Sequence, residues 1–114
     1  MRFDELLKAH SSKEALAWLQ SGKPDSRMLG ELPTTAASIE IVRELYDLGA
    51  GRVTAMNIAT YDTREENAGR LIVSLPREVS VRAKIFAWCN SQAREQGFDV
   101  EADFGQDYLF VMLD

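Results

Sequence analysis

Acidic residues alternate along one stretch of the chain, where Asp99, Glu101 and Asp103 precede Gly105. Carboxylates at every second position are found in calcium-binding loops, which also need a glycine at the sixth position and a glutamate at the twelfth. Here the glycine comes one position late and the twelfth position is Phe110. The spacing therefore fails as a calcium motif, and we interpret the three acids as the solvated face of a half-exposed strand.

The other residues that could do chemistry are isolated. His10 is the only histidine, and no cysteine or carboxylate around it has the spacing of a zinc site. Cys89 is the only cysteine, and its place on the apolar stripe of a long helix predicts a buried, inert thiol. Gly49-Ala50-Gly51 follows a helix and precedes a strand, the reverse of a phosphate-binding loop. We therefore predict no catalytic residue, metal or cofactor, and enzymatic activity is disfavoured.

Six apolar residues, from Tyr108 to Leu113, come just before Asp114. A short apolar run without polar alternation is typical of a strand that is buried on both faces. One face of this strand carries Tyr108, Phe110 and Met112, a patch too large to stay uncovered on a soluble monomer. We expect the N-terminal residues, including Trp18, to cover it; a partner or a second subunit is the alternative.

The remaining elements follow from periodicity and capping signals. Residues 1–33 are predicted to form a helical extension that packs on the main domain and contains a capping box of Ser11 and Glu14. The main domain, 34–114, is predicted to contain helices over 34–48 and from Pro76 to Gln96. Its predicted strands are 52–61, 70–75, 98–103 and 108–113, with a connection over 62–69 between the first two.

This order of elements predicts an α+β fold, a two-layer α/β sandwich of two αββ units. It corresponds to a circularly permuted ferredoxin-like sheet with strand order 3-4-2-1. We expect strands 70–75 and 108–113 to lie in parallel at the centre, and the acidic strand 98–103 to lie at an edge. Both helices should cover the face that carries Leu71, Leu109 and Val111.

Composition limits the classes of partner. A chain of 114 residues with 46% hydrophobic content is the size of one domain and can bury a core. Thirteen Lys and Arg against eighteen Asp and Glu give a net charge of -5, which disfavours nucleic acid and anionic membranes and favours basic protein partners. The sequence shows no signal peptide and no apolar run of membrane-spanning length, so a cytoplasmic protein is expected.

The preferred hypothesis is a small, non-catalytic protein-interaction or regulatory module. It would meet a basic partner through Asp99, Glu101 and Asp103 or through the connection 62–69.

Two alternatives remain open. A small-molecule-binding domain or small enzyme would have a pocket between the open sheet face and the N-terminal helices, lined by Tyr108, Phe110, Met112 and Trp18. A homodimer would pair two open sheet faces. The strand aromatics are also similar to those of single-stranded RNA readers, but the neighbouring acids oppose that function.

Overall fold

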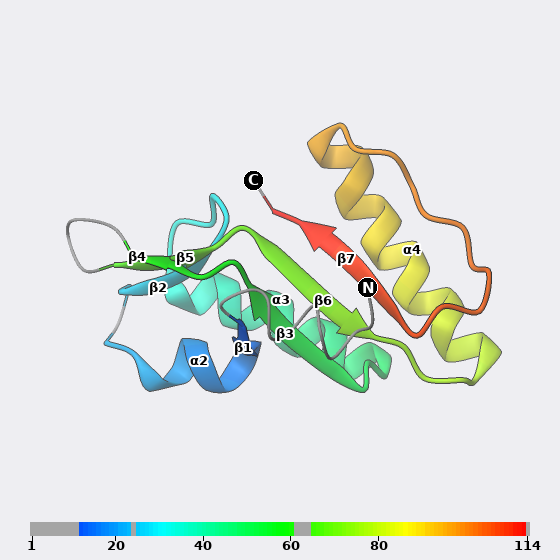
Figure 1. Cartoon of the computed structure of the whole chain (residues 1–114), viewed down its shortest axis with the longest axis horizontal. Coiled ribbons are helices and arrows are strands. Elements are labelled where there is room, and N and C mark those ends of the chain that lie inside the picture. Colours follow the sequence, from blue (N-terminus) through cyan, green and yellow to red (C-terminus); the bar gives the residue numbers. More distant parts are fainter. Residues whose placement is uncertain (1–11, 24, 61–64, 114) are drawn as a thin grey trace.

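The structure is a computed structural model of the chain, and it describes residues 12–23, 25–60 and 65–113 (Figure 1). These residues form an α+β structure with helices α2 (Ala15–Ser21), α3 (Thr35–Leu48) and α4 (Val79–Gln96). One sheet contains β1 (Ser12–Glu14), β3 (Arg52–Met56), β6 (Arg70–Ser74) and β7 (Tyr108–Met112); a smaller one contains β2 (Arg27–Leu29), β5 (Glu66–Ala68) and β4 (Ala59–Thr60). None of the described helices is long and apolar enough to cross a membrane.

A single long hairpin links the two sheets. Met56 pairs with Arg70 in the larger sheet and Ala59 pairs with Asn67 in the smaller one, and the register is the same on both sides of the break. The break falls at Asn57, which has a positive φ of 56°. The predicted strand 52–61 is therefore interrupted at this point. Part of the predicted connection 62–69 is strand β5, and residues 61–64 lie outside the described part of the chain.

The larger sheet has the order β1-β3-β6-β7, and every neighbouring pair is antiparallel. The expected parallel pairing of 70–75 with 108–113 is therefore wrong, and 108–113 lies at an edge of the sheet instead of at its centre. After α4 the chain runs back along that helix, and it enters β7 beside the end of β6, where Leu75 N–H donates to Asp107 O at 2.8 Å (Figure 1). We call residues 98–107 the return segment. Because this segment returns the chain to the end of β6, β7 runs antiparallel to β6.

The predicted strand 98–103 is not formed. The strand expected at one edge of the predicted order 3-4-2-1 is therefore missing, and the larger sheet has β1 at its opposite edge. A ferredoxin-like order is not confirmed. Asn90 of α4 bonds to the backbone of Glu101, and Arg82 binds the carboxylate of Asp103. These bonds hold the return segment against the helix, away from the ladder of β7.

All three helices contribute to one core on one face of the larger sheet. Strand residues such as Leu71, Leu109 and Val111 are buried there, as the alternation predicts. Trp18 and Leu19 of α2 belong to the same core, so α2 lies on the helix-covered face. Each buried aliphatic side chain contributes about 1.5–3 kcal/mol. The division of the chain at residue 33 stays a prediction.

Helix α2 begins differently from the predicted capping box. Glu14 is the capping residue, and its carboxylate accepts bonds from Leu16 N–H at 3.1 Å and Ala17 N–H at 2.6 Å. Ser11 lies outside the described residues. The Tyr46 hydroxyl of α3 donates to the same carboxylate at 2.5 Å and accepts from Val53 N–H at 3.0 Å. One carboxylate therefore ties α2 to α3 and, through Tyr46, to β3.

Replacing Glu14 tests this junction. Burial alone would raise the pKa of Glu14, but hydrogen bonds from Tyr46, Ala17 and Leu16 and the charge of Arg52 lower it below its ordinary value of 4.5. The ionised form therefore adds stability that is present above pH 4.5 and is lost as the pH falls through the folded-state pKa. We expect Glu14→Gln to lower the free energy of unfolding at pH 7 by about 1 kcal/mol.

The measurement is urea unfolding of both proteins from neutral pH into the acid range, with the exposed Glu40→Gln as the control. The wild-type advantage should shrink as the pH falls. A difference that is independent of pH would contradict the role of the carboxylate.

Gly30 allows a close approach of two backbone segments. Its φ is +54°, and a Cβ atom there would collide with the carbonyl oxygen of Leu113. Gly97 has a φ of +80° but open space around its Cβ position. The left-handed conformation by itself costs a non-glycine residue about 1–2 kcal/mol. We expect Gly97→Ala to cost about that amount and Gly30→Ala clearly more, as measured by chemical unfolding; equal losses would disprove the collision.

Candidate functional site

Strand β7 lies at the end of the larger sheet, so one of its edges faces away from β6. Leu113 N–H donates to Gly69 O at 2.9 Å, which shows that odd-numbered residues here bond towards β6. Residues alternate between the two sides of an antiparallel strand, so Phe110 and Met112 direct their backbone N–H and C=O groups outwards. No described residue hydrogen-bonds to these outward groups. This part of β7 can therefore accept another strand.

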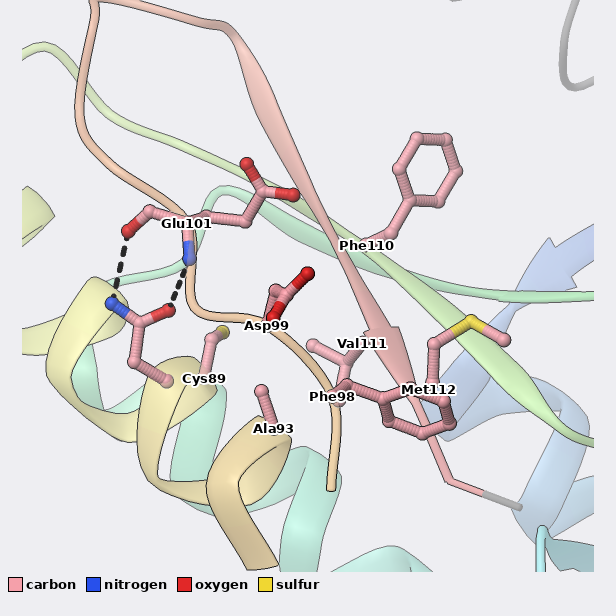
Figure 2. Close-up of a pocket in the computed structure, with 9 residues that line it drawn as sticks. Cys89, Ala93, Phe98, Asp99, Glu101, Phe110, Val111 and Met112 are labelled. Atoms are coloured by element: carbon pink, nitrogen blue, oxygen red, sulfur yellow. Dashed lines mark hydrogen bonds between the residues drawn. The ribbon is translucent and has the colours of Figure 1, made fainter. Parts of the chain in front are cut away.

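Two adjoining cavities follow this free edge. One, of about 190 Å³, lies at the Met112 end; the other, of about 330 Å³, lies at the Tyr108 end. Both are lined by Glu101 and Phe110, so they form one depression. We call the space between β7 and the return segment the edge groove. Figure 2 shows its Met112 end, with Cys89 reaching into it from α4.

The return segment forms the outer wall of the edge groove. The Asn90 side chain holds its middle, donating from Nδ2 to Glu101 O at 3.0 Å and accepting Glu101 N–H at Oδ1 at 2.9 Å (Figure 2). Arg82 holds its far end through two bonds to the carboxylate of Asp103, of 2.6 and 3.1 Å. Arg82 also donates to the backbone oxygen of Gln106 at 3.0 Å. These polar contacts attach the wall to α4.

Apolar side chains are unusually exposed around the groove. Phe98, Val100 and Phe104 of the return segment are 41%, 48% and 79% exposed, and Phe110 of β7 is 40% exposed. Apart from these, Val79 at the start of α4 is the one large exposed hydrophobic residue in the described part of the chain. Clustered exposed apolar surface of this kind is typical of an interaction site.

The three predicted acids have different environments. Asp103 is paired with Arg82, and hydrogen bonds from Arg82 and from Gly105 N–H lower the pKa of Asp103. Neither ion pair among the described residues involves Asp99 or Glu101. In Figure 2 both of these side chains extend from the return segment towards β7. Asp99 and Glu101 therefore make the groove wall acidic, whereas Asp103 is a structural anchor.

The structure brings together the three predicted residues of β7. The rings of Tyr108 and Phe110 meet edge to face with centroids 5.4 Å apart. The Arg70 guanidinium lies 5.6 Å from the centre of the Phe110 ring, and its Nε donates to Met112 Sδ at 3.1 Å. These contacts form a row of aromatic, cationic and thioether groups on the sheet face opposite the main core.

Trp18 does not join that row. It is 2% exposed, lies in the main core, and has the Arg27 guanidinium 5.9 Å from its ring centre. Its Nε1 atom is buried and has no hydrogen-bond partner among the described residues. Among the described residues, the sheet aromatics and Trp18 therefore lie on opposite faces of the larger sheet.

Four residues of the site were missed by the sequence reasoning: Arg82, Asn90, Phe98 and Phe104. Two had a signal in the sequence. Arg82 occupies the buried stripe of α4, four positions before Phe86 and seven before Cys89, where a charge needs a partner. Asn90 is a polar residue next to the same stripe. The spacing of these residues cannot indicate which backbone groups they bind, because their partners lie beyond the helix.

No cluster of metal-ligating side chains is present among residues 12–23, 25–60 and 65–113. His10 lies outside these ranges. Cys89 is 6% exposed at the floor of the edge groove, and burial raises the pKa of its thiol to about 12. The site therefore offers backbone hydrogen-bonding groups, apolar surface and carboxylates.

No model of a known protein family matches the chain, and no curated protein or solved structure matches it either. The function must therefore be inferred from the site itself.

The Cys89 thiol provides a direct check of how closed the groove floor is. We expect it to react with a thiol reagent at pH 8 far more slowly than a free thiol, because its pKa is about 12. Unfolding in urea should restore ordinary reactivity. Rapid labelling of the native protein would contradict the burial of Cys89.

Proposed function

We propose that the chain is a non-catalytic protein-interaction module that binds a basic, extended segment of a partner protein in the edge groove. The observation that carries this proposal is the outward backbone of Phe110 and Met112, which meets no hydrogen-bonding group in the described structure. An extended peptide can add to such an edge as a further strand. Backbone bonds then supply affinity, and alternate side chains supply specificity.

The groove suits the length of a short strand. Strand β7 has five residues, and the two cavities extend along it from Met112 to Tyr108. Five residues of an extended chain span about 17 Å. Apolar side chains of the ligand would meet the exposed rings of Phe98, Phe104 and Phe110.

Charge selects the partner. Asp99 and Glu101 border the groove and lie in no described ion pair, and the whole chain has a net charge of -5. Opposite charge speeds association and excludes acidic competitors. A ligand that alternates lysine or arginine with apolar residues matches both properties of the wall.

This proposal modifies the expectation of an acidic edge strand, because β7 is the edge and the acids stand on the wall opposite it. The alternative site at 62–69 lies partly outside the described residues. A pocket between the sheet face and the N-terminal helices gains no support from α2, which packs on the other face. A cytoplasmic location and a homodimer stay predictions.

Peptide selection tests the proposal. We expect a displayed library of random peptides, each about nine residues long and thus longer than the strand it would pair with, to yield ligands that alternate basic and apolar residues. The double variant Asp99→Lys/Glu101→Lys should bind them roughly tenfold or more weakly, a loss of about 1.4 kcal/mol. The matched control is Glu40→Lys/Glu44→Lys on the exposed surface of α3, which makes the same charge change away from the groove.

A second measurement separates strand addition from charge attraction alone. Two versions of a selected peptide would be N-methylated, one at the odd-numbered residues and one at the even-numbered residues. Only one of these versions should lose binding, because only one set of N–H groups faces β7. A library that yields no ligand would overturn the proposal. Equal loss of affinity in both charge variants would also overturn it.

A further inference from the structure

We infer that residues 98–103 are a built-in competitor for the edge of β7: they can leave α4, pair with β7 as an antiparallel strand and so close the edge groove. This inference rests on the proposed function for its regulatory meaning. The conformational change itself rests on the residues described below.

The sequence of this segment is that of a strand, although the structure holds it outside the sheet. Phe98, Val100 and Ala102 alternate with acids, and both Phe98 and Val100 are more than 40% exposed. Strict alternation is typical of a strand with one buried face. The present conformation therefore leaves apolar side chains in water that a paired strand would bury.

Glycines border the segment on both sides. Gly97 and Gly105 have φ values of +80° and +89°, and a Cβ atom at either position would meet nothing within 4 Å. Backbone rotation at both ends is thus sterically open. Small changes at these two residues can swing the segment between α4 and β7.

Asn90 holds residues 98–103 in the present position together with Arg82, which binds the carboxylate of Asp103. The side-chain amide of Asn90 bonds to both the N–H and the C=O of Glu101, as a neighbouring strand would. Pairing with β7 needs these same two groups of Glu101. The Asn90 side chain and strand β7 therefore compete for the same backbone groups of Glu101.

Geometry fixes the register of the closed form. A four-residue turn over 104–107 places Glu101 opposite Phe110 and Asp99 opposite Met112. Phe110 and Met112 are the residues with outward backbone groups, so Glu101 and Phe110 would form a hydrogen-bonded pair. The acids then share a face with Arg70, which lies across from Met112 on β6.

The other face of the new strand meets α4. In this register Val100 lies opposite Val111 and Ala102 opposite Leu109, on the helix-covered side of the sheet. The cavity of about 190 Å³ that Cys89, Ala93 and Val111 line is on this side of β7. It gives Val100 a place to bury.

Cross-linking measures the closed population. In a Cys89→Ala background, the pair Glu101→Cys/Phe110→Cys should form a disulfide under mild oxidation, because directly opposed residues of an antiparallel pair have Cα atoms about 5.5 Å apart. Adding Asn90→Ala removes the two hydrogen bonds that the Asn90 side chain makes to Glu101. Loss of two ordinary hydrogen bonds should raise the rate of disulfide formation about tenfold or more.

A shifted cysteine pair separates strand pairing from simple loosening. Ala102→Cys/Phe110→Cys places the two thiols on opposite faces of the proposed register, so its rate should change little when Asn90→Ala is added. The exposed Ser91→Ala is the control for a change on α4. Equal acceleration of both pairs would overturn the inference, and so would no acceleration of the first pair.

These rates need no ligand, so the result stands apart from the proposed function. If peptides are selected as described, the oxidised Glu101→Cys/Phe110→Cys protein should lose their binding and regain it on reduction. Full binding by the oxidised protein would overturn the competition. If Asn90→Ala accelerates only the Glu101→Cys/Phe110→Cys pair and no peptide ligand is selected, the proposed function is refuted. The inference that 98–103 can pair with β7 then still stands.

Discussion

The structure depends on the hydrogen-bonded pairing of β6 with both of its neighbours. Leu71, Ile72 and Val73 are completely buried, and β6 pairs with β3 on one side and β7 on the other. A buried backbone group without a partner costs about 1–3 kcal/mol, so this strand cannot occupy an edge. With β6 fixed at the centre, the long hairpin places β3 on one side, and the other side is left for β7. Among the described residues, β7 therefore forms the edge of the sheet next to β6, and β1 forms the opposite edge.

The direction of β7 depends on where the chain travels after α4. The return segment brings the chain back to the end of β6 before β7 starts, and Arg82 holds this route by binding Asp103 and Gln106 O. The same route leaves the segment beside the free edge without pairing to it. A groove with one backbone wall and one acidic wall results. The groove combines carboxylates with the outward backbone groups of Phe110 and Met112, to which no described residue hydrogen-bonds.

Much of the local structure could be predicted because it depends on near neighbours in the sequence. Helix α3 ends at Gly49 and α4 at Gly97, both in the left-handed conformation that glycine favours. Alternation correctly placed Leu109 and Val111 on the core face. The helix start near Ser11 was less predictable, because Glu14 is held as a cap partly by Tyr46, a residue distant in the sequence.

The sequence by itself determined the α+β class, the buried central strand β6 and the buried thiol, because periodicity and apolar content show which faces must leave water. Only the tertiary structure decided the direction of β7, the addition of β1 to the sheet and the position of residues 98–103. The alternation of apolar and acidic residues in 98–103 gives a strand an apolar face and an acidic face, but it does not specify which strand it would pair with. The choice between β7 and α4 is set by long-range bonds from Asn90 and Arg82, whose energies are comparable with those of a strand ladder.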